Sequence, residues 1–408
     1  MNVETNAAAE PKARVAGAEA RAKAQDQLRD QTLQVEVLEG RDAFLALEKE
    51  WNAALSKGPR DEPMLRHEWL RAWIENFAAG ATLRTLVVRS GRELHAALPL
   101  VESKERSADT CFVPLTTWAS ASNDHSQRGG MLLGRRGSEA LPLLWARLVE
   151  TKGWDRLRLR DLPQGAAEWR LRELAEGSGH PIGLWTSLRS PYLPISKQTF
   201  EQVLARVDAK FRANLRRRRR RLAEQGEVKY VVLDGKNAQA LDVGLADFFD
   251  IEASGWKGKG GTAIAQRPEL VGFYTQLARD AAKRGALALG FLELNGKRIA
   301  AHLSLIQAGR HFLLKLGYDE AFHEFSPGQQ LVHDAIEDAC KRGLVEFDFL
   351  GPFMEWKADW ETGFRTHAWL SIFRPTQQGR LIAEARFVLW PVARSLLGRA
   401  RAALRKES

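Results

Sequence analysis

The chain has 408 residues, of which 44% are hydrophobic, so it can bury two ordinary cores, because domains usually span about 100 to 200 residues. Its 61 Lys and Arg residues outnumber its 51 Asp and Glu residues, and the net charge of +10 favours anionic partners such as phosphates, acidic glycans or a membrane surface. The chain has two cysteines in apolar contexts far apart in the sequence, which indicates neither a disulfide framework nor a metal site. It shows no signal-peptide core and no apolar run long enough to span a bilayer, so a cytoplasmic protein is expected.

Residues 1–32 contain few large apolar side chains and are expected to form a disordered tail. Residues 33–190 then show strand and helix periodicities in turn, which predicts a first α/β domain. Its expected elements are a strand at Leu33–Leu38, helices at Asp42–Leu55 and Arg66–Phe77, a hairpin of Leu83–Arg89 and Leu94–Val101, a helix at Leu141–Glu150 and a strand at Arg156–Arg160. A polar loop with Asp124 and His125 lies between apolar runs of this domain.

A basic segment, residues 197–226, follows a connector at Ser187–Ser196 and contains six consecutive arginines, Arg216–Arg221. Six neighbouring guanidinium groups cannot all be buried, so the segment is either a solvated helix or a helix that contacts phosphate, which guanidinium groups bind well. RNA, lipid phosphate and nucleotide-sugar phosphate all fit this pattern. Aromatic residues do not alternate with the arginines, so the pattern gives no support to base stacking.

Residues 227–376 repeat the order of elements of the first domain, which predicts a tandem of two similar α/β units. The expected elements are a strand at Val228–Leu233, helices at Ala238–Ala253 and Pro268–Lys283, strands at Leu287–Leu294, Arg298–Ile306 and His311–Tyr318, a helix that begins at Ser326-Pro327, and a strand at Val345–Leu350. Asn295-Gly296 is a strong hairpin signal. The segment WDRLRLRDLP, which ends at Pro163, has its counterpart in GLVEFDFLGP, which ends at Pro352.

Leu313–Trp360 is the stretch around which the second unit is organised. Ser326 and Pro327 are typical of a helix start, because a serine oxygen can cap free N–H groups and proline suits the first helical position. Gly343 is expected to end this helix. Where a helix joins two parallel strands, it begins at the C-terminal edge of the sheet, and its free N–H groups favour an anion such as a pyrophosphate.

Four segments of the second half carry a family resemblance: SPGQQL, FDFLG, WKADW and, upstream, EASGWKGKGGTAI. They resemble acetyltransferase-like proteins associated with cellulose and exopolysaccharide synthesis, a branch of the GNAT superfamily akin to the FemAB-type aminoacyl transferases. The resemblance is sharpest over Phe200–Arg374 and fainter over Leu38–Pro194. It implies a tandem GNAT-like α/β fold with mixed sheets flanked by helices, an acyltransferase activity, and acetyl-CoA as the co-substrate.

The resemblance also implies where the donor binds. The pyrophosphate of coenzyme A would lie at the helix start, against Ser326, Gly328, Gln329 and Gln330. The family's usual loop has more glycines and a leading basic or amide residue, and this chain departs from that pattern. Pro327 has no N–H, so the backbone N–H groups that follow it are the remaining donors.

Charged residues inside apolar strands mark the candidate catalytic centre. Asp348 is expected to be buried, where it would act as a general base or as the partner of a buried lysine, Lys357 or Lys315. These lysines would also hold anionic groups of the substrate. Tyr318, at the end of its strand, is a candidate acid for the leaving group or, alternatively, an aromatic residue at the rim of the site.

Further substrate contacts are expected from Glu252, Trp256 and Trp356. The first two precede or enter a Gly- and Lys-rich loop, Gly255–Gly261, which suits closure over a substrate. A helix cap followed by a solvated loop is the alternative. Residues 378–408 predict a basic amphipathic helix that either docks on the protein or lies on an anionic leaflet, which would place the protein at the periphery of the inner membrane.

The resemblance, together with these patterns, implies three possible functions. The first is transfer of an acyl group, acetyl by default, to an amine or hydroxyl of a saccharide or lipid-linked glycan precursor in polysaccharide or cell-envelope biosynthesis. The second is a FemAB-like aminoacyl transfer from aminoacyl-tRNA, with the arginine segment on RNA phosphates. The third is a non-catalytic accessory protein of a polysaccharide synthesis or export system.

Overall fold

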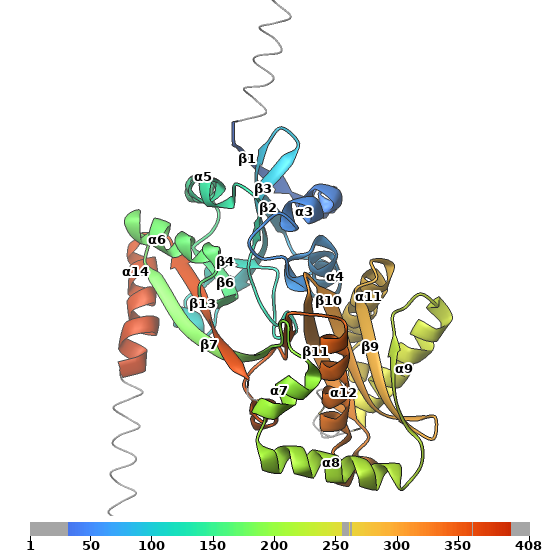
Figure 1. Ribbon diagram of the computed structural model, residues 1–408. Helices are drawn as coiled ribbons and strands as arrows, with labels where there is room; N and C mark the ends of the chain where they lie inside the picture. Colours follow the sequence, from blue (N-terminus) through green and yellow to red (C-terminus); the bar gives the residue numbers. More distant parts are fainter. Residues whose placement is uncertain (1–31, 255–260, 262, 361, 393–408) are drawn as a thin grey trace, which may run out of the picture.

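The computed structural model describes residues 32–254, 261, 263–360 and 362–392. Thirteen strands of these residues form one sheet in the order β1-β2-β3-β4-β6-β13-β7-β12-β11-β10-β9-β8, with β5 paired to β3. The strands are β1 (Gln34–Glu39), β2 (Leu83–Ser90), β3 (Glu93–Glu105), β4 (Leu115–Ser120), β5 (Leu132–Leu133), β6 (Arg156–Pro163), β7 (Ile182–Pro194), β8 (Val228–Leu233), β9 (Leu287–Leu294), β10 (Lys297–Gln307), β11 (Arg310–Tyr318), β12 (Glu346–Asp348) and β13 (Gly363–Phe373). Figure 1 shows the sheet running through both halves of the chain.

Helices flank this sheet. They are α2 (Gly40–Leu45), α3 (Glu48–Leu55), α4 (His67–Phe77), α5 (Gly137–Glu150), α6 (Arg170–Gly177), α7 (Phe200–Arg206), α8 (Ala209–Ala223), α9 (Ala238–Ala253), α11 (Pro268–Lys283), α12 (Pro327–Lys341), α13 (Glu355–Ala358) and α14 (Gln377–Glu384). We call β1 to β7 with their helices the N-terminal half, and α7 to β13 the C-terminal half.

The strand order is symmetrical about the centre of the sheet. β4 and β6 are parallel neighbours in the N-terminal half, as β11 and β12 are in the C-terminal half. The last strand of each half has crossed over, because β13 pairs with β6 and β7 pairs with β12. β13 and β7 also pair with each other, antiparallel, between the two halves (Figure 1). Each half is therefore completed by a strand of the other half.

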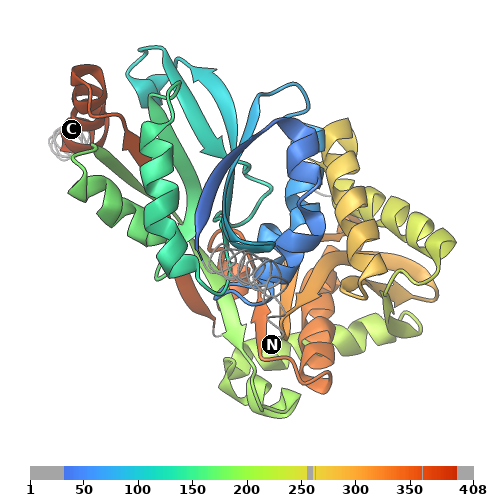
Figure 2. The same ribbon diagram turned by 90° about the horizontal axis from the view of Figure 1, so that it is seen from above.

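A shared apolar core joins the helices of the two halves. Trp69 of α4 packs edge-on against Phe273 of α11, with ring centroids 5.5 Å apart, and both rings belong to one buried cluster. Along the same helix pair, Arg71 and Asp280 form an ion pair at 2.5 Å. Figure 2 shows α11, in gold, beside the blue N-terminal helices. The two halves thus share a core as well as a sheet.

Most elements expected from the sequence are confirmed, including the helix at Pro327 and the hairpin turn at Asn295-Gly296, where both residues have positive φ. Two expectations are wrong. The helix at Asp42–Leu55 is broken into α2 and α3, and the connector at Ser187–Ser196 lies mostly within strand β7. Strand β13 has no counterpart among the expected elements.

The expected terminal segments lie largely outside the described residues. This holds for the tail over 1–32 and for much of the basic helix over 378–408, which begins as α14 and continues through a π-helical turn at Ala385–Leu389. Phe387 anchors this turn, since a Cβ at Gly183 would lie 2.3 Å from its ring. Leu381, Val388 and Trp390 are exposed. The described helices include none with the length and apolarity that a membrane span requires. Contact of the C-terminal helix with a membrane surface stays a prediction.

Candidate functional site

The site lies where β11 and β12 stop pairing. The two parallel strands pair only at Arg310–Phe312 and Glu346–Asp348, and β11 then continues towards α12 with β10 as its remaining partner. We call this place the β11–β12 fork. A β-bulge lies on the same stretch of β11, because Leu303 pairs with Lys315 and Ser304 with Leu313, which leaves Leu314 outside the ladder. Bulges re-aim backbone groups and are over-represented beside active sites.

The corresponding fork of the N-terminal half, between β4 and β6, is closed by its own chain. The loop after β4 returns to β6, and the N–H of Gly129 donates to the carbonyl oxygen of Asp161 at 3.1 Å. A Cβ at Gly129 would lie 1.8 Å from the carbonyl oxygen of Arg160, so this contact has no room for a side chain. The pairing of β3 with β4 is also continuous, without a bulge. The C-terminal half is therefore the better candidate for the active unit.

The first turn of α12 opens towards the β11–β12 fork. The expectation that Ser326 caps this helix is wrong: the residue adopts a left-handed conformation with φ of 51°, and no side chain caps the helix. The Ser326 Oγ instead accepts a hydrogen bond from Arg218 of α8. A Cβ on Gly328 would lie 3.3 Å from the Tyr318 ring, which places that ring against the turn. An uncapped N-terminus beside a guanidinium group suits a phosphate.

The two glutamines of this turn use their side chains to fix neighbouring elements. The Gln329 amide donates to the carbonyl oxygen of Trp356 at 3.1 Å and accepts from the Trp360 indole at 2.8 Å. The Gln330 amide donates to the carbonyl oxygen of Leu215 in α8 at 3.0 Å. The donor-binding role of both residues stays a prediction.

Asp348 is fully buried and is held by two arginines. Its Oδ2 accepts hydrogen bonds from Arg128 at 2.7 Å and from Arg365 at 3.2 Å, while its Oδ1 accepts from the N–H of Leu350 at 3.0 Å. Burial by itself would lower the pKa of the Arg128 guanidinium, but the charges of Asp348 and Glu62 raise it above its ordinary value. Both oxygens of this carboxylate are thus engaged by groups of the protein itself, so its contacts are those of a residue that positions its neighbours.

Lys357 is the better placed proton acceptor. Its Nζ donates to the carbonyl oxygens of Leu350 at 2.6 Å and Pro352 at 3.0 Å, and the side chain is almost fully buried. Burial lowers the pKa of this ammonium to about 8, an effect to which Lys315 adds and which Asp348 opposes. A neutral amine has two N–H groups, so both can serve the carbonyl oxygens while the lone pair stays available.

Asp348 and Lys357 are connected through the backbone of Leu350. This residue has a left-handed conformation, with φ of 50°, which is costly for a leucine. Asp348 holds its N–H and Lys357 binds its carbonyl oxygen. The structure thus brings both predicted residues to one turn, where the Leu350 backbone connects them.

The N-terminal half contributes residues that sequence reasoning did not assign to this site. The loop after β4 brings the Arg128 guanidinium into contact with Asp348. The same loop places the His125 Nδ1 3.1 Å from the Tyr274 hydroxyl of α11. Burial, with a contribution from the charge of Lys315, lowers the pKa of His125 to about 4. The Lys315 Nζ lies 5.5 Å from the centroid of the Tyr274 ring. The polar composition of the loop is the one signal that pointed to it.

The remaining predicted residues lie around the neighbouring loop. Glu252 is buried, and its Oε2 accepts from the N–H of Ile264 at 2.9 Å, which ties the far end of the loop to α9. The Ser254 hydroxyl donates to the carbonyl oxygen of Tyr318 at 3.0 Å. Trp356 is half-buried and packs on Phe349 at 6.0 Å. Trp256 lies outside the described residues, so its predicted substrate contact remains open.

Residues 209–358 match the family model described as an acetyltransferase (GNAT) domain. No curated protein matches the chain. Among solved structures, that of FemX is similar with a TM-score of 0.57 at 12% identity, and the match covers 85% of this chain and 100% of that one. The C-terminal domain of a provisionally named lysylphosphatidylglycerol synthetase from Agrobacterium fabrum gives a TM-score of 0.51 at 11% identity, over 84% and 96%. At these identities the likeness concerns the fold, and the expected tandem GNAT-like α/β fold is confirmed.

Proposed function

We propose that the protein, whose residues 209–358 match an acetyltransferase (GNAT) domain model, moves an acyl group from acyl-CoA to an amine or hydroxyl of a saccharide or lipid-linked glycan precursor. Acetyl is the default group, and polysaccharide or cell-envelope biosynthesis is the expected setting. The observation that carries the proposal is Lys357, a buried lysine with a pKa of about 8 beside the β11–β12 fork. Acyl transfer to an amine needs such a proton acceptor close to neutral pH.

The donor would lie along the fork with its pyrophosphate at the first turn of α12. The uncapped N–H groups of that turn and the Arg218 guanidinium beside Ser326 support this placement. Acyl-CoA supplies an activated thioester. Leu314, which the bulge leaves outside the β10–β11 ladder, is the candidate source of a backbone N–H for the oxygen that becomes negative during transfer.

The acceptor would enter between Lys357, Lys315 and the His125–Tyr274 pair. Its nitrogen or oxygen attacks the thioester carbon, Lys357 takes the proton, and the carbon–sulfur bond breaks to release the coenzyme A thiolate. Tyr318, whose ring lies beside the first turn of α12, is the candidate donor of a proton to that thiolate. Lys315 would hold an anionic group of the acceptor. Asp348 acts in this scheme by fixing Leu350, and through it Lys357, rather than by taking a proton.

A comparison of the two halves supports the choice of Lys357. Glu168 follows Pro163 at the same interval as Lys357 follows Pro352, so the two residues occupy equivalent positions. Glu168 is buried and forms an ion pair with Arg60 at 2.5 Å. The N-terminal half therefore has an ion-paired carboxylate where the C-terminal half has a lysine that can lose its proton.

Calorimetric titration of acetyl-CoA into the wild type, Arg218→Gln and Arg217→Gln tests the donor site. Arg217 is the matched control, because it lies on the same helix and donates a hydrogen bond to Asn214 of α8 itself. We expect Arg218→Gln to weaken binding about tenfold, which corresponds to about 1.4 kcal/mol, and the control to stay within about twofold. Release of thiol in the presence of amino sugars then measures transfer. If the wild type does not bind acetyl-CoA, acetyl-CoA is not the acyl donor.

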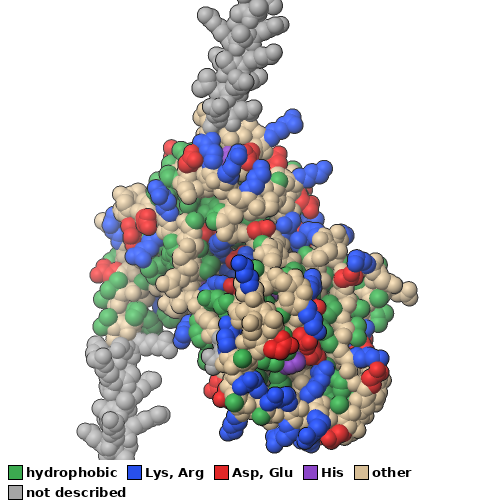
Figure 3. Space-filling view, viewed as in Figure 1, with side chains coloured by type: hydrophobic (Ala, Val, Ile, Leu, Met, Phe, Trp, Pro, Cys, Tyr) green, Lys and Arg blue, Asp and Glu red, His purple; other side chains and the backbone are tan. Residues whose placement is uncertain are grey.

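A FemAB-like aminoacyl transfer is the second candidate. The observation that favours it is the exposure of Arg216, Arg217 and Arg220 on α8, which leaves a cationic surface next to α12. Figure 3 shows Lys and Arg side chains gathered along the lower edge of this face, over α8. Aminoacyl-tRNA would then bind with an affinity that falls steeply with salt, and transfer from it in place of acetyl-CoA would establish this alternative.

A further inference from the structure

A pocket of about 370 Å³ lies between α8 and α12, outside the β11–β12 fork. Its α8 wall includes Arg216, Arg219 and Arg220, which the helical spacing places on one face. Gln330 and His333 of α12 form the opposite wall. Gln329, one position earlier, bonds to Trp356 of α13. The pocket therefore adjoins the first turn of α12 and shares Gln330 with it.

The cations of this pocket are only partly neutralised. Arg219 forms an ion pair with Asp334 at 3.0 Å, and the other oxygen of that carboxylate lies 3.0 Å from the His333 Nδ1. The Arg220 side chain is 76% exposed, and its contact with Glu224 is long, at 3.9 Å. Arg216 has no acidic partner within the part of the chain that the structure describes. One carboxylate thus orients two lining side chains while two guanidinium groups keep their charge for a ligand.

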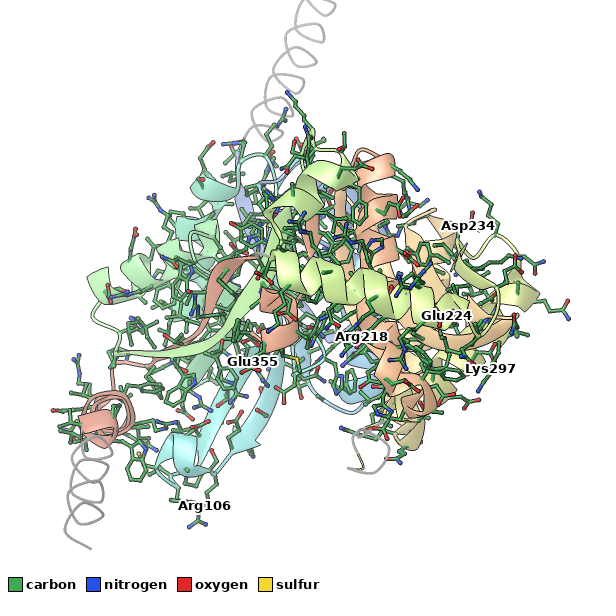
Figure 4. All side chains as sticks on the ribbon, turned by 60° about the horizontal axis from the view of Figure 1, so that its bottom comes forward. Arg106, Arg218, Glu224, Asp234, Lys297 and Glu355 are labelled. Carbon is green, nitrogen blue, oxygen red and sulfur yellow. The ribbon has the colours of Figure 1, made fainter. Side chains whose placement is uncertain are left out.

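The chemistry of the lining selects phosphate. Guanidinium groups bind phosphate oxygens through paired hydrogen bonds, and Asp334 fixes one of the three in place. The volume is at the lower end of the roughly 300 to 1,000 Å³ range of small-molecule sites, which suits a nucleotide better than a single ion. Figure 4 shows α8 crossing in front of the C-terminal half, with Arg218 near its middle and Glu224 at its end.

We propose that the pocket between α8 and α12 binds a phosphorylated ligand of nucleotide size, separately from the acyl group and the acceptor. The phosphate groups would contact Arg216, Arg219 and Arg220. A nucleotide of this kind could be the end of a coenzyme or of a sugar nucleotide. Both carry the same diphosphate chemistry, so the probes must separate them.

Binding of ADP, UDP and inorganic pyrophosphate, measured by calorimetry at low salt, tests the site without reference to acyl transfer. The variants are Arg216→Gln, Arg220→Gln and their combination. Arg217→Gln, which removes one charge from the same helix, is the control for each single variant. Because both pocket arginines are exposed, the fold should persist, and thermal unfolding checks this. We expect the double variant to weaken binding about tenfold or more and the control to change it less than about twofold.

The ratio of the two nucleotide affinities assigns the source. Equal affinity for ADP and UDP means that the diphosphate alone is recognised, whereas a preference for one of them identifies adenine or uracil as part of the ligand. Either result supports the site if the affinity depends on Arg216 and Arg220. The proposal is overturned if neither nucleotide binds at millimolar concentration or if the double variant binds like the wild type. It is also overturned if single-stranded RNA binds and Arg217→Gln weakens it as much as the double variant does, because the whole exposed face of α8 would then be the binding surface.

Discussion

Arg128 of the N-terminal half donates a hydrogen bond to Asp348 of the C-terminal half at 2.7 Å, and both side chains are almost completely buried. Arg128 also forms an ion pair with Glu62 at 3.1 Å. The contact joins the loop after β4 to the turn that carries Leu350 and Lys357. The position of the candidate base therefore depends on a residue from the other half of the molecule.

Replacing Arg128 by Met should strongly destabilise the protein. The change leaves Asp348 and Glu62 buried with fewer cations, and breaking a buried pair costs about 3 to 5 kcal/mol. Urea unfolding measures the loss. Arg172→Met is the control, because Arg172 and Glu176 form an exposed pair on α6 and such pairs contribute about 0.5 kcal/mol or less. Equal stability of the two variants would mean that the buried pair has no structural role.

The rate of acyl transfer should rise with pH through about 8. Lys357 has a pKa of about 8, and only its neutral form can take a proton, so kcat/KM increases as pH rises through that value and then levels off. Lys357→Met should lower kcat about 10²- to 10⁴-fold and abolish the rise of kcat/KM with pH. Lys341→Met, at an exposed lysine of α12, should leave the profile unchanged. If kcat/KM of Lys357→Met still rises with pH through about 8, another group is the base.

The same lysine should make stability depend on pH. The folded protein releases the Lys357 proton at about 8 and the unfolded chain near the ordinary value of 10.5. Between these values the unfolded state binds more protons, so the free energy of unfolding should rise as pH increases from 8 towards 10.5. The difference between the wild type and Lys357→Met over this interval isolates the contribution. A difference that stays flat would show that the lysine titrates at its ordinary pKa when folded.

Gly351→Ala should reduce turnover more than its effect on stability predicts. Gly351 has φ of 59°, and a Cβ there would lie 3.5 Å from the Gln127 Oε1 and 3.6 Å from the Lys357 Nζ. Gly343→Ala is a matched control with φ of 68° and nothing within 4 Å. Both variants should lose about 1 to 2 kcal/mol through backbone strain, but only Gly351→Ala should lower kcat. Equal kcat values would place the reacting atoms elsewhere.

The exposed apolar residues after α14 should support binding to anionic vesicles. Val388 and Trp390 are more than half exposed, and a basic apolar helix can lie in the interface of an anionic leaflet. Val388→Asp combined with Trp390→Ser should reduce co-sedimentation with such vesicles. Leu143→Asp, at an exposed leucine of α5, should leave it unchanged. A wild-type protein that stays wholly in the supernatant would rule out the membrane contact.

Local signals predicted the C-terminal half well. The helix start at Pro327, the stop at Gly343 and the turn at Asn295-Gly296 follow from backbone preferences that a few neighbouring residues determine. A charge inside an apolar run identified both Asp348 and Lys315. The arginine partners of Asp348 could not be predicted in this way, because they come from a distant loop and from β13.

The exchanged strands could not be predicted from local patterns. β7 contains Pro191 and Pro194 and exposes Leu184 and Trp185, so it lacks the alternation of a half-buried strand and looks like a connector. Its partners are β12 and β13, which are far away in the sequence. The same distance separates Arg128 from Asp348, and no spacing rule connects such residues.

Because β7 and β13 each complete the sheet of the other half, neither half should be stable without the other. A chain cut between β7 and α7 would give two fragments, each with its central sheet edge unpaired, and exposed edges of this kind invite aggregation. Neither fragment should be recoverable as a stable monomer, whereas co-expressed fragments should reassemble. Because each half is completed by a strand of the other, neither half can be removed without exposing a sheet edge in the half that remains.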